Sequence, residues 1–387
     1  MMSTPYTWDI FCRVVDNFGD AAVCWRLARQ LALEHGDRVR LWIDDVSPLE
    51  RLNPEISAAR EAQEVDTVAI RRWTGPLDAA MPAQVVVEAF GGGLPEPYVA
   101  AMAAAAQRPL WLVLEYLSAE PWVPAHHGRP SPPPRVALER YYFFPGFVEG
   151  TGGLLREREL FARRDRFDDA ASAALWRTLG HEPPGPGSTT VSVFSYESAP
   201  LRELLECWSG GPAPTVVALP EGRALPLALD YFGAGDPAPG RVLRRGALEV
   251  RVVPFMPQAL YDELLWSCDI NFVRGEDSFV RAQWAARPFV WQAYPQPEGA
   301  HVAKLEAFMQ AYSTGLPSGP RDAVWDMSRI WNQIAAPGVT PASAWRALQA
   351  SQGLLRQHGA AWAERLASLG DLAGNLRCFW RRKVKNG

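Results

Sequence analysis

The feature that most constrains the fold is a repeated order of apolar strand-like run, short polar turn and helix-like run. Continuous apolar strands separated by helices are typical of parallel sheets covered on both faces, so we predict an α/β fold. In the first half, strands are expected at residues 8–15, 39–43, 84–90 and 110–116. In the second half, strands are expected at residues 190–196, 215–219, 249–255, 269–274 and 288–292.

The alternation restarts after a stretch rich in proline and glycine. A chain of 387 residues is long for a single core. Residues 182–188 read Glu-Pro-Pro-Gly-Pro-Gly-Ser, which suits a linker better than a helix or a central strand. We therefore expect a first domain at 1–181, a second at 182–360 and a C-terminal helix at 361–387 that packs back on the first domain.

Composition excludes several classes of protein. The chain is 48% hydrophobic and 21% charged, as globular proteins are, and its net charge of −4 gives no reason to expect nucleic-acid binding. It offers no apolar run long enough to span a membrane and no signal-like N-terminus, so we expect a cytoplasmic protein. The five cysteines and six histidines lack ligand spacing, so neither a metal nor another cofactor is expected.

One candidate site is the turn Asp16-Asn17-Phe18-Gly19-Asp20, which joins the first expected strand to a helix. Ligands of open α/β sheets gather beyond the carboxyl ends of strands, where this turn lies. The alternative is structural: Asp16 ends the strand and Asp20 caps the helix. The pattern alone leaves the two interpretations about even.

A second candidate site follows the strand expected at 269–274. In Arg274-Gly275-Glu276-Asp277-Ser278, the N–H groups at the start of the next helix would suit a phosphate. Ser278 would assist, Glu276 and Asp277 would face sugar hydroxyls, and Arg274 and Arg281 would offset their charge. The alternative is an ordinary helix cap.

Aromatic residues at the same expected edge suit a nucleobase. Tyr196 ends the first strand of the second half, and Phe255, Gln258 and Tyr261 lie between a later strand and its helix. The rings could stack a base and Gln258 could bind one by hydrogen bonds. Taken singly, each ring is more often part of a core.

Two doubly wound domains joined by a hinge fit several classes of protein: nucleotide-sugar glycosyltransferases, two-domain dehydrogenases and periplasmic-type binding proteins. The lack of a signal peptide disfavours the binding proteins. A dehydrogenase would need G-x-G-x-x-G after a strand, whereas this chain has Gly91-Gly92-Gly93 followed by Pro95 and Pro97.

The chain resembles bacterial elongation factor P arginine rhamnosyltransferases, the EarP family. The resemblance is carried by motifs that run through the chain in the same order: V-D-N-F-G-D (15–20), W-R-L-A-R (25–29), L-W-I-D-D-V (41–46), E-Y-L-S-A-E (115–120), G-G-L-x-R-E-R (152–158), P-F-x-P-Q (254–258), R-G-E-D-S-F-V-R-A-Q (274–283) and Y-P-Q (294–296).

The resemblance implies two Rossmann-like domains facing across a cleft, the GT-B glycosyltransferase fold. It implies an inverting, metal-independent transfer of L-rhamnose from dTDP-β-L-rhamnose to an arginine of elongation factor P. Asp20 would be the general base and Asp16 its essential neighbour. The nucleotide sugar would contact the following residues: Asn17, Phe18, Gly19, Tyr196, Phe255, Gln258, Tyr261, Arg274, Gly275, Glu276, Asp277 and Ser278.

Two rival functions remain open. One is a related glycosyltransferase with another sugar nucleotide or acceptor, and the other is a sugar-nucleotide-binding regulator without turnover. The presence of both Asp16 and Asp20 argues against the regulator, because binding alone needs no base on the acceptor side.

Overall fold

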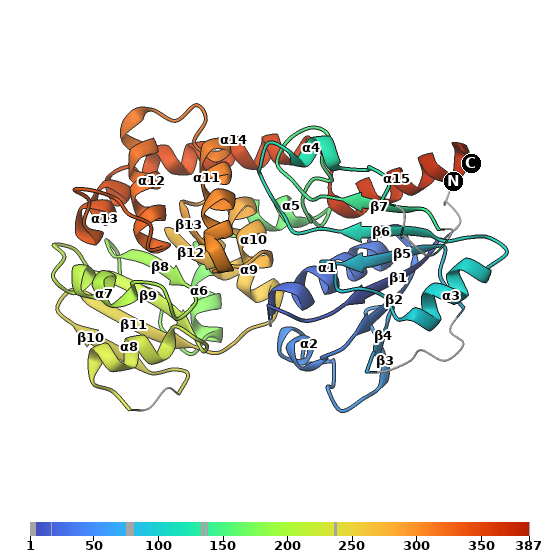
Figure 1. Ribbon diagram of the computed structural model, residues 1–387. Coiled ribbons are helices and arrows are strands. Elements are labelled where there is room, and N and C mark those ends of the chain that lie inside the picture. Colours follow the sequence, from blue (N-terminus) through green and yellow to red (C-terminus); the bar gives the residue numbers. More distant parts are fainter. Residues whose placement is uncertain are drawn as a thin grey trace. The chain divides into compact units, whose positions relative to one another are not determined.

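The chain forms two compact units, here called unit 1 and unit 2 (Figure 1). The computed structural model describes residues 5–16, 18–74, 81–131, 133, 136, 138–235 and 238–386. Unit 1 comprises residues 1–158 and 365–387, and unit 2 comprises residues 159–364. The second boundary falls inside helix α14 (Gln352–Ala367).

Unit 1 is a seven-stranded sheet in the order β3-β4-β2-β1-β5-β6-β7. All neighbouring pairs are parallel except β3 with β4. Its strands are β1 (Thr7–Cys12), β2 (Arg38–Ile43), β3 (Ala62–Val65), β4 (Val68–Arg72), β5 (Val85–Ala89), β6 (Leu110–Leu114) and β7 (Arg140–Phe143). Its helices, besides the end of α14, are α1 (Phe18–His35), α2 (Ser47–Leu52), α3 (Glu96–Ala104), α4 (Val123–His126) and α15 (Leu372–Asn386).

Helices cover both faces of this sheet. Successive side chains of β1 point to opposite faces, and each face meets a different helix. Phe11 packs in a cluster with Tyr98 and Met102 of α3. Its neighbour Cys12 contacts Cys24 of α1 instead. Both cysteines are buried and act as small apolar side chains of the core.

The far side of α1 is fixed by a polar network that involves the segment 152–158 and α15. Gln30 donates from Nε2 to the carbonyl of Arg156 at 2.8 Å and to Oδ1 of Asp371 at 2.9 Å. Just after the C-terminal end of α1, Asp37 forms a buried ion pair with Arg377 of α15 at 2.8 Å. The motif at 152–158 therefore helps to hold the helix that carries Asp20.

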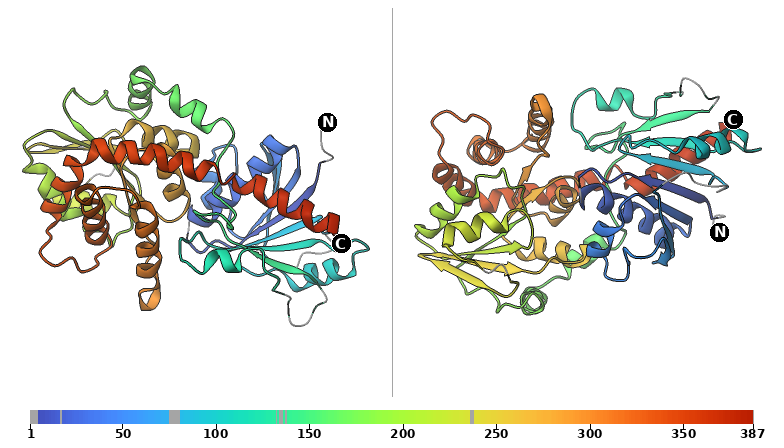
Figure 2. Two further views of the ribbon diagram at one scale, coloured as in Figure 1. Left: turned by 90° about the horizontal axis from the view of Figure 1, so that it is seen from above. Right: turned by 60° about the horizontal axis from the view of Figure 1, so that its bottom comes forward.

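Unit 2 is a six-stranded sheet in the order β10-β11-β9-β8-β12-β13, in which only β10 with β11 is antiparallel. Its strands are β8 (Thr189–Val193), β9 (Thr215–Pro220), β10 (Val242–Arg245), β11 (Leu248–Val253), β12 (Ile270–Arg274) and β13 (Phe289–Gln292). Each sheet lies between helices when the units are seen from two further directions (Figure 2).

The helices of unit 2, besides most of α14, are α5 (Leu160–Asp165), α6 (Asp169–Thr178), α7 (Leu201–Ser209), α8 (Leu225–Phe232), α9 (Gln258–Ser267), α10 (Asp277–Ala285), the short 3₁₀ helix η1 (Pro297–Gly299), α11 (Ala300–Tyr312), α12 (Ser318–Trp331) and α13 (Pro341–Ala350).

The division into units differs from the expected first boundary at 181/182. Leu175 and Trp176 of α6 are buried in a cluster with Val253 and Leu264 of unit 2. Apolar burial therefore assigns α6 to unit 2, and α5 belongs to the same unit, although both precede the proline-rich stretch in the sequence. That stretch, residues 182–188, connects α6 to β8 within unit 2.

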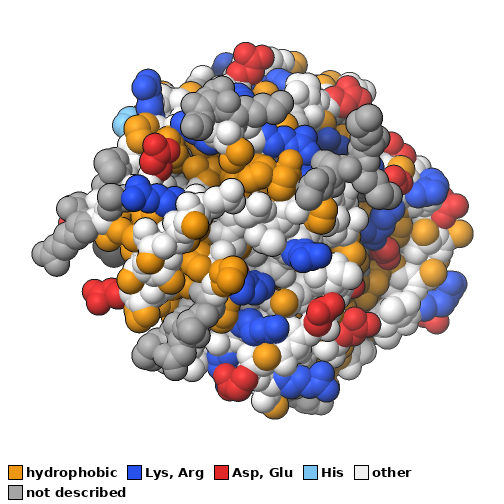
Figure 3. All heavy atoms as spheres, turned by 90° about the vertical axis from the view of Figure 1, so that its right-hand side faces the viewer, with side chains coloured by type: hydrophobic (Ala, Val, Ile, Leu, Met, Phe, Trp, Pro, Cys, Tyr) orange, Lys and Arg blue, Asp and Glu red, His pale blue; other side chains and the backbone are white. Residues whose placement is uncertain are grey.

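On the face shown in Figure 3, acidic and basic side chains are interspersed with apolar ones, and neither sign of charge forms a separate patch. This agrees with the 39 basic and 43 acidic residues of the chain. No helix within the described residues has the length and apolar character that a membrane span requires.

A buried ion pair joins α9 to α10. Arg281 donates to both oxygens of Asp262, at 2.8 and 2.7 Å, and both side chains are almost fully buried. Removing one partner of such a pair leaves an uncompensated buried charge, which costs about 3–5 kcal/mol.

We therefore expect Arg281→Met to lower the stability of unit 2 by that amount, measured by urea unfolding. Arg321→Met is the matched control, since its pair with Asp322 is exposed and worth at most about 1 kcal/mol. Equal unfolding midpoints for the two variants would show that the buried pair does not hold these helices.

Candidate functional site

The first strand of unit 1 lies in the middle of its sheet, between β2 and β5. The chain leaves β1 for β2 on one side and returns later to β5 on the other. Such a switch point opens a crevice at the carboxyl ends of the strands, where ligands of open α/β sheets bind. The turn with Asp16 and Asp20 lies there, while Asn17 is outside the described residues.

The carboxylate of Asp20 is buried in the first turn of α1, with 2% of the residue exposed. Its Oδ2 accepts hydrogen bonds from the backbone N–H groups of Val15 at 2.8 Å and Asp16 at 2.9 Å. Its Oδ1 accepts a longer bond of 3.4 Å from the hydroxyl of Tyr116. One oxygen thus fixes the turn, and the other is held only by a side chain.

Burial raises the pKa of Asp20, and the negative charge of Asp16 adds to this effect. The two backbone N–H groups and the Tyr116 hydroxyl oppose it by stabilising the charged form. A carboxylate with a raised pKa is a stronger base, so the environment of Asp20 suits proton transfer.

Gly19 allows Asp16 to lie close to the start of α1. Its N–H donates to the carbonyl of Asp16 at 2.6 Å, and a Cβ atom at position 19 would lie 2.8 Å from Oδ2 of Asp16. A side chain at position 19 would therefore displace the Asp16 carboxylate, whereas the φ of Gly19 is not in the left-handed region and does not itself call for glycine. Phe18 is half-buried, and the guanidinium of Arg51 lies 5.8 Å from its ring centre.

Tyr116 is a site residue that sequence reasoning missed. It follows β6, and its ring stacks on Phe90, which follows β5, with ring centres 4.5 Å apart. Both rings therefore lie at the carboxyl ends of the strands, as Asp20 does. The available signal was the E-Y-L-S-A-E motif, which places a hydroxyl-bearing ring directly after a buried strand.

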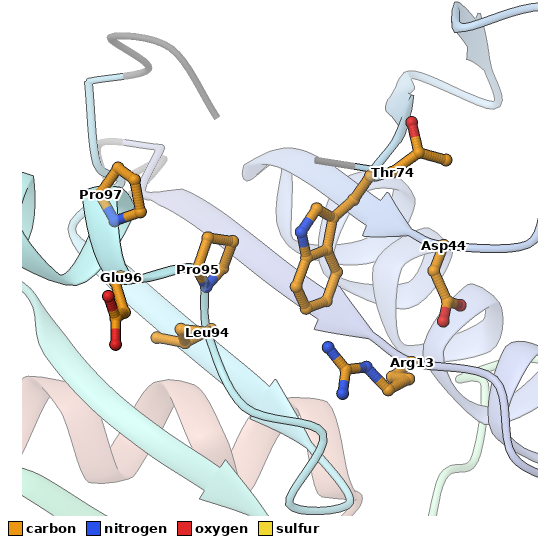
Figure 4. A pocket seen from close by; sticks show the side chains of 8 residues that line it. Arg13, Asp44, Thr74, Leu94, Pro95, Glu96 and Pro97 are labelled. Carbon is orange, nitrogen blue, oxygen red and sulfur yellow. The ribbon is translucent and has the colours of Figure 1, made fainter. Parts of the chain in front are cut away.

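A shallow pocket of about 710 Å³ lies beyond the ends of β1, β2 and β4. Arg13 and Asp44 lie on one side of it, opposite the segment from Leu94 to Pro97 (Figure 4). Oδ1 of Asp44 accepts from the N–H of Val14 at 2.9 Å. A carboxylate after β2 thus supports the same turn from its other side.

Unit 2 repeats this arrangement, since β8 lies between β9 and β12. Arg274, the last residue of β12, is buried, with its guanidinium carbon 4.4 Å from the ring centres of both Phe194 and Tyr196. Tyr196 is itself buried, and the guanidinium lies over its ring. The structure therefore brings together two residues that are 78 positions apart, and fixes the direction of the arginine.

The turn after Arg274 is closed by Ser278. Its Oγ accepts from the N–H of Arg274 at 3.2 Å and donates to the carbonyl of the same residue. Gly275 has a φ of +62°, and its carbonyl accepts from the indole of Trp291 at 2.8 Å. A glycine is therefore needed in this turn, and Ser278 shapes it.

The N-terminus of α10 has the properties expected of an anion site. Glu276 occupies the cap position without a side-chain cap bond, and the first intrahelical bond runs from Val280 N–H to the Glu276 carbonyl at 2.9 Å. The N–H groups of the first turn thus have no acceptor within the helix. Gln258, the first residue of α9, donates from Nε2 to Oδ2 of Asp277 at 3.2 Å.

Of the remaining aromatic residues, Tyr261 lies next to these groups and Phe255 follows β11. Tyr261 packs against Phe194 with ring centres 5.8 Å apart, and burial raises the pKa of its hydroxyl. Phe255 is half-buried, and its N–H donates to Oε2 of Glu221 at 3.2 Å. Arg281, which was expected to offset charge at this turn, forms an ion pair with Asp262 within the core.

The described residues contain no cluster of three or more histidine, cysteine, aspartate or glutamate side chains that could hold a metal ion. The two candidate sites are therefore carboxylates supported by backbone N–H groups in unit 1, and helix N–H groups with aromatic rings in unit 2.

Comparisons with known proteins identify relatives over nearly the whole chain. The family described as Elongation-Factor P (EF-P) rhamnosyltransferase EarP matches residues 8–381. The protein-arginine rhamnosyltransferase of Pseudomonas putida is 46% identical over 380 residues, 98% of this chain and 99% of the relative. That of Neisseria meningitidis serogroup B is 34% identical over 396 residues, all of both chains.

Solved structures show the same fold. A structure concerning EarP-mediated arginine glycosylation of translation elongation factor EF-P has 34% identity and a TM-score of 0.68, covering 97% of this chain and 99% of that one. The Anabaena protein HepE in complex with UDP-glucose has 10% identity and a TM-score of 0.51, covering 98% and 100%. The expected GT-B glycosyltransferase fold is confirmed.

The environment of Asp20 predicts a cost in stability. Its pKa is raised on folding, so the ionised carboxylate destabilises the folded state above that pKa, and the cost disappears below the unfolded value of about 4. Asp20→Asn removes this cost and keeps an oxygen for the N–H groups of Val15 and Asp16.

We expect Asp20→Asn to unfold at the same or a higher temperature than the parent chain at pH 7.5, with the advantage shrinking toward pH 4. Thermal unfolding at both pH values measures this, with the exposed Asp322→Asn as the control. A midpoint several degrees below that of the parent chain at pH 7.5 would contradict the argument.

Proposed function

Since the chain belongs to the EarP family of elongation factor P rhamnosyltransferases, we propose that it transfers L-rhamnose from dTDP-β-L-rhamnose to an arginine of translation elongation factor P. The relatives named above are protein-arginine rhamnosyltransferases, and this chain is an enzyme of that kind. The donor and the protein acceptor are the proposed part. An acceptor that works in translation would place the enzyme in the cytoplasm.

The observation that carries the proposal is the carboxylate pair at the carboxyl end of β1. A guanidinium is planar and protonated, so it is a poor nucleophile. Full proton transfer to an ordinary aspartate would cross about nine pKa units, roughly 12 kcal/mol. Asp16 and Asp20 can orient the cation by charge-assisted hydrogen bonds before any proton moves.

Proton removal is then coupled to bond formation. A guanidinium nitrogen attacks C1 of rhamnose, the bond from C1 to the diphosphate oxygen breaks with its electron pair, and the configuration inverts. Asp20 accepts the proton as the nitrogen becomes more acidic in the transition state. Its raised pKa, caused first by burial, narrows the gap that the proton has to cross.

Unit 2 would hold the donor. The N–H groups at the start of α10 and the guanidinium of Arg274 face the charge that develops on the leaving diphosphate. Tyr196, Phe255, Gln258 and Tyr261 would surround the thymine. The position of Arg274 between two rings supports this role, because a fixed cation needs no reorganisation during the reaction.

The experiment is incubation of the enzyme with dTDP-β-L-rhamnose and elongation factor P, followed by mass spectrometry of acceptor peptides. One added deoxyhexose on an arginine peptide is the expected result. No added sugar, or the same sugar on a residue other than arginine, would refute the proposal.

Asp20→Asn should lose about 10² to 10⁴ in turnover, because it keeps the shape of the side chain but cannot accept the proton. Its affinity for dTDP, measured by calorimetry, should stay unchanged, since the proposed nucleotide contacts belong to unit 2. Asp322→Asn should keep full turnover. Near-normal turnover of Asp20→Asn would reduce this residue to a structural role in the turn.

Turnover should not depend on a divalent metal, because Arg274 and helix N–H groups take the place of a cation at the diphosphate. We expect full activity in excess EDTA. A loss of activity that added Mg²⁺ restores would contradict this part of the proposal.

A further inference from the structure

Lys304 stands out in the sequence because the chain otherwise uses arginine for its basic residues. Of the 39 basic residues, three are lysines, and the other two, Lys383 and Lys385, lie in the last turns of α15. Lys304 is the only lysine in the first 382 residues. A position that takes lysine in such a chain is a candidate for a role that a guanidinium fills less well.

The structure places this lysine at the proposed donor site. Lys304 lies in α11, and its Nζ is 3.7 Å from Oε1 of Glu276, the cap residue of α10. The Lys304 side chain is 20% exposed and that of Glu276 is 16% exposed. Partial burial reduces screening by solvent, so the two charges affect each other more than a surface pair would.

The charges at the start of α10 explain why a cation is needed. Glu276 and Asp277 put two carboxylates beside the N–H groups proposed to hold a diphosphate, and like charges repel. Asp277 accepts from the amide of Gln258, which brings no charge. Arg281 already has its charge compensated by Asp262. Lys304 offsets the charge of Glu276 and so lowers the negative potential that a bound diphosphate would meet.

An ammonium suits this position better than a guanidinium. It is a compact charge with three donors on a flexible stem, whereas arginine binds carboxylates through a planar fork. A fork engaged with both oxygens of Glu276 would turn that carboxylate away from other partners. A carboxylate has about four acceptor sites, so one ammonium contact still allows it to accept a hydrogen bond from a ribose or sugar hydroxyl.

We propose that Lys304 is a positioning residue of the donor site: by neutralising and orienting Glu276, it lets the start of α10 accept the diphosphate of the nucleotide sugar. The inference rests on the proposed function, because it assumes that this helix start binds dTDP. It adds a residue that none of the site motifs contains.

The test is calorimetry of the full chain with dTDP and with thymidine, which lacks phosphate. Lys304→Gln should weaken dTDP binding about tenfold or more, and leave thymidine binding within about twofold. Lys383→Gln, a lysine of unit 1, is the matched control and should bind both as the parent chain does. Unchanged thymidine binding also shows that the variant is folded.

A double-mutant cycle separates an indirect role from direct contact. In the Glu276→Gln background there is no charge to offset, so Lys304→Gln should change dTDP affinity less than twofold. An equal loss in both backgrounds would mean that the ammonium binds phosphate itself, and would overturn the positioning role.

The two proposals fail in different ways. If the parent chain does not bind dTDP, the donor assignment falls and this inference falls with it. If the parent chain binds dTDP and Lys304→Gln binds it equally well, only the inference is refuted.

Discussion

In each sheet, the first strand in chain order lies in the middle and is hydrogen-bonded on both sides. Both candidate sites depend on this constraint. β1 pairs with β2 and β5, and β8 pairs with β9 and β12, so the chain must leave each central strand in one direction and return on the other side. The turns after β1 and β12 are thereby kept free of crossing connections. Reactive side chains are placed on these turns, while rigid strands hold them in position.

The two turns contain the same kinds of groups, backbone N–H donors and carboxylates, but the first is proposed to bind a cation and the second an anion. In unit 1, the N–H groups of Val15 and Asp16 hold one oxygen of the Asp20 carboxylate, and the hydroxyl of Tyr116 contacts the other. In unit 2, the proposed anion site is the start of α10, where Gln258 contacts the carboxylate of Asp277 and Lys304 contacts that of Glu276. In each unit, backbone N–H groups provide hydrogen-bond donors at the turn, and the charged and polar side chains beside them determine the local charge.

The sequence predicted the central strands of both sheets and the edge strand β13, and it missed β3, β4, β7 and β10. Long apolar runs such as 110–116 and 269–274 became β6 and β12, because central parallel strands are apolar on both faces. β3, β7 and β10 have four residues each and half-exposed faces, so their patterns are too short to separate from loops. The expected boundary at 181/182 differs from the division into units because α6 packs against residues of unit 2, which local composition does not show.

The site could be predicted where its residues are neighbours in the chain, as in 16–20 and 274–278. Tyr116 lies 96 positions from Asp20, and Lys304 lies 28 positions from Glu276, so only the folded chain shows that they meet. The contact of Arg274 with Tyr196 is similar. Tertiary packing creates these pairs, and no periodicity in a single sequence records them.

The attachment of α15 to α1 has a consequence for synthesis of the protein. Asp371 and Arg377 meet Gln30 and Asp37, so residues synthesised some 340 positions later complete the polar network behind the helix that carries Asp20. Domains that form from one continuous segment can fold as they emerge, whereas unit 1 has to wait until α15 has been synthesised. A chain that stops before Asp371 would leave those buried polar groups unsatisfied, so we expect such a truncated chain to be degraded instead of being partly active.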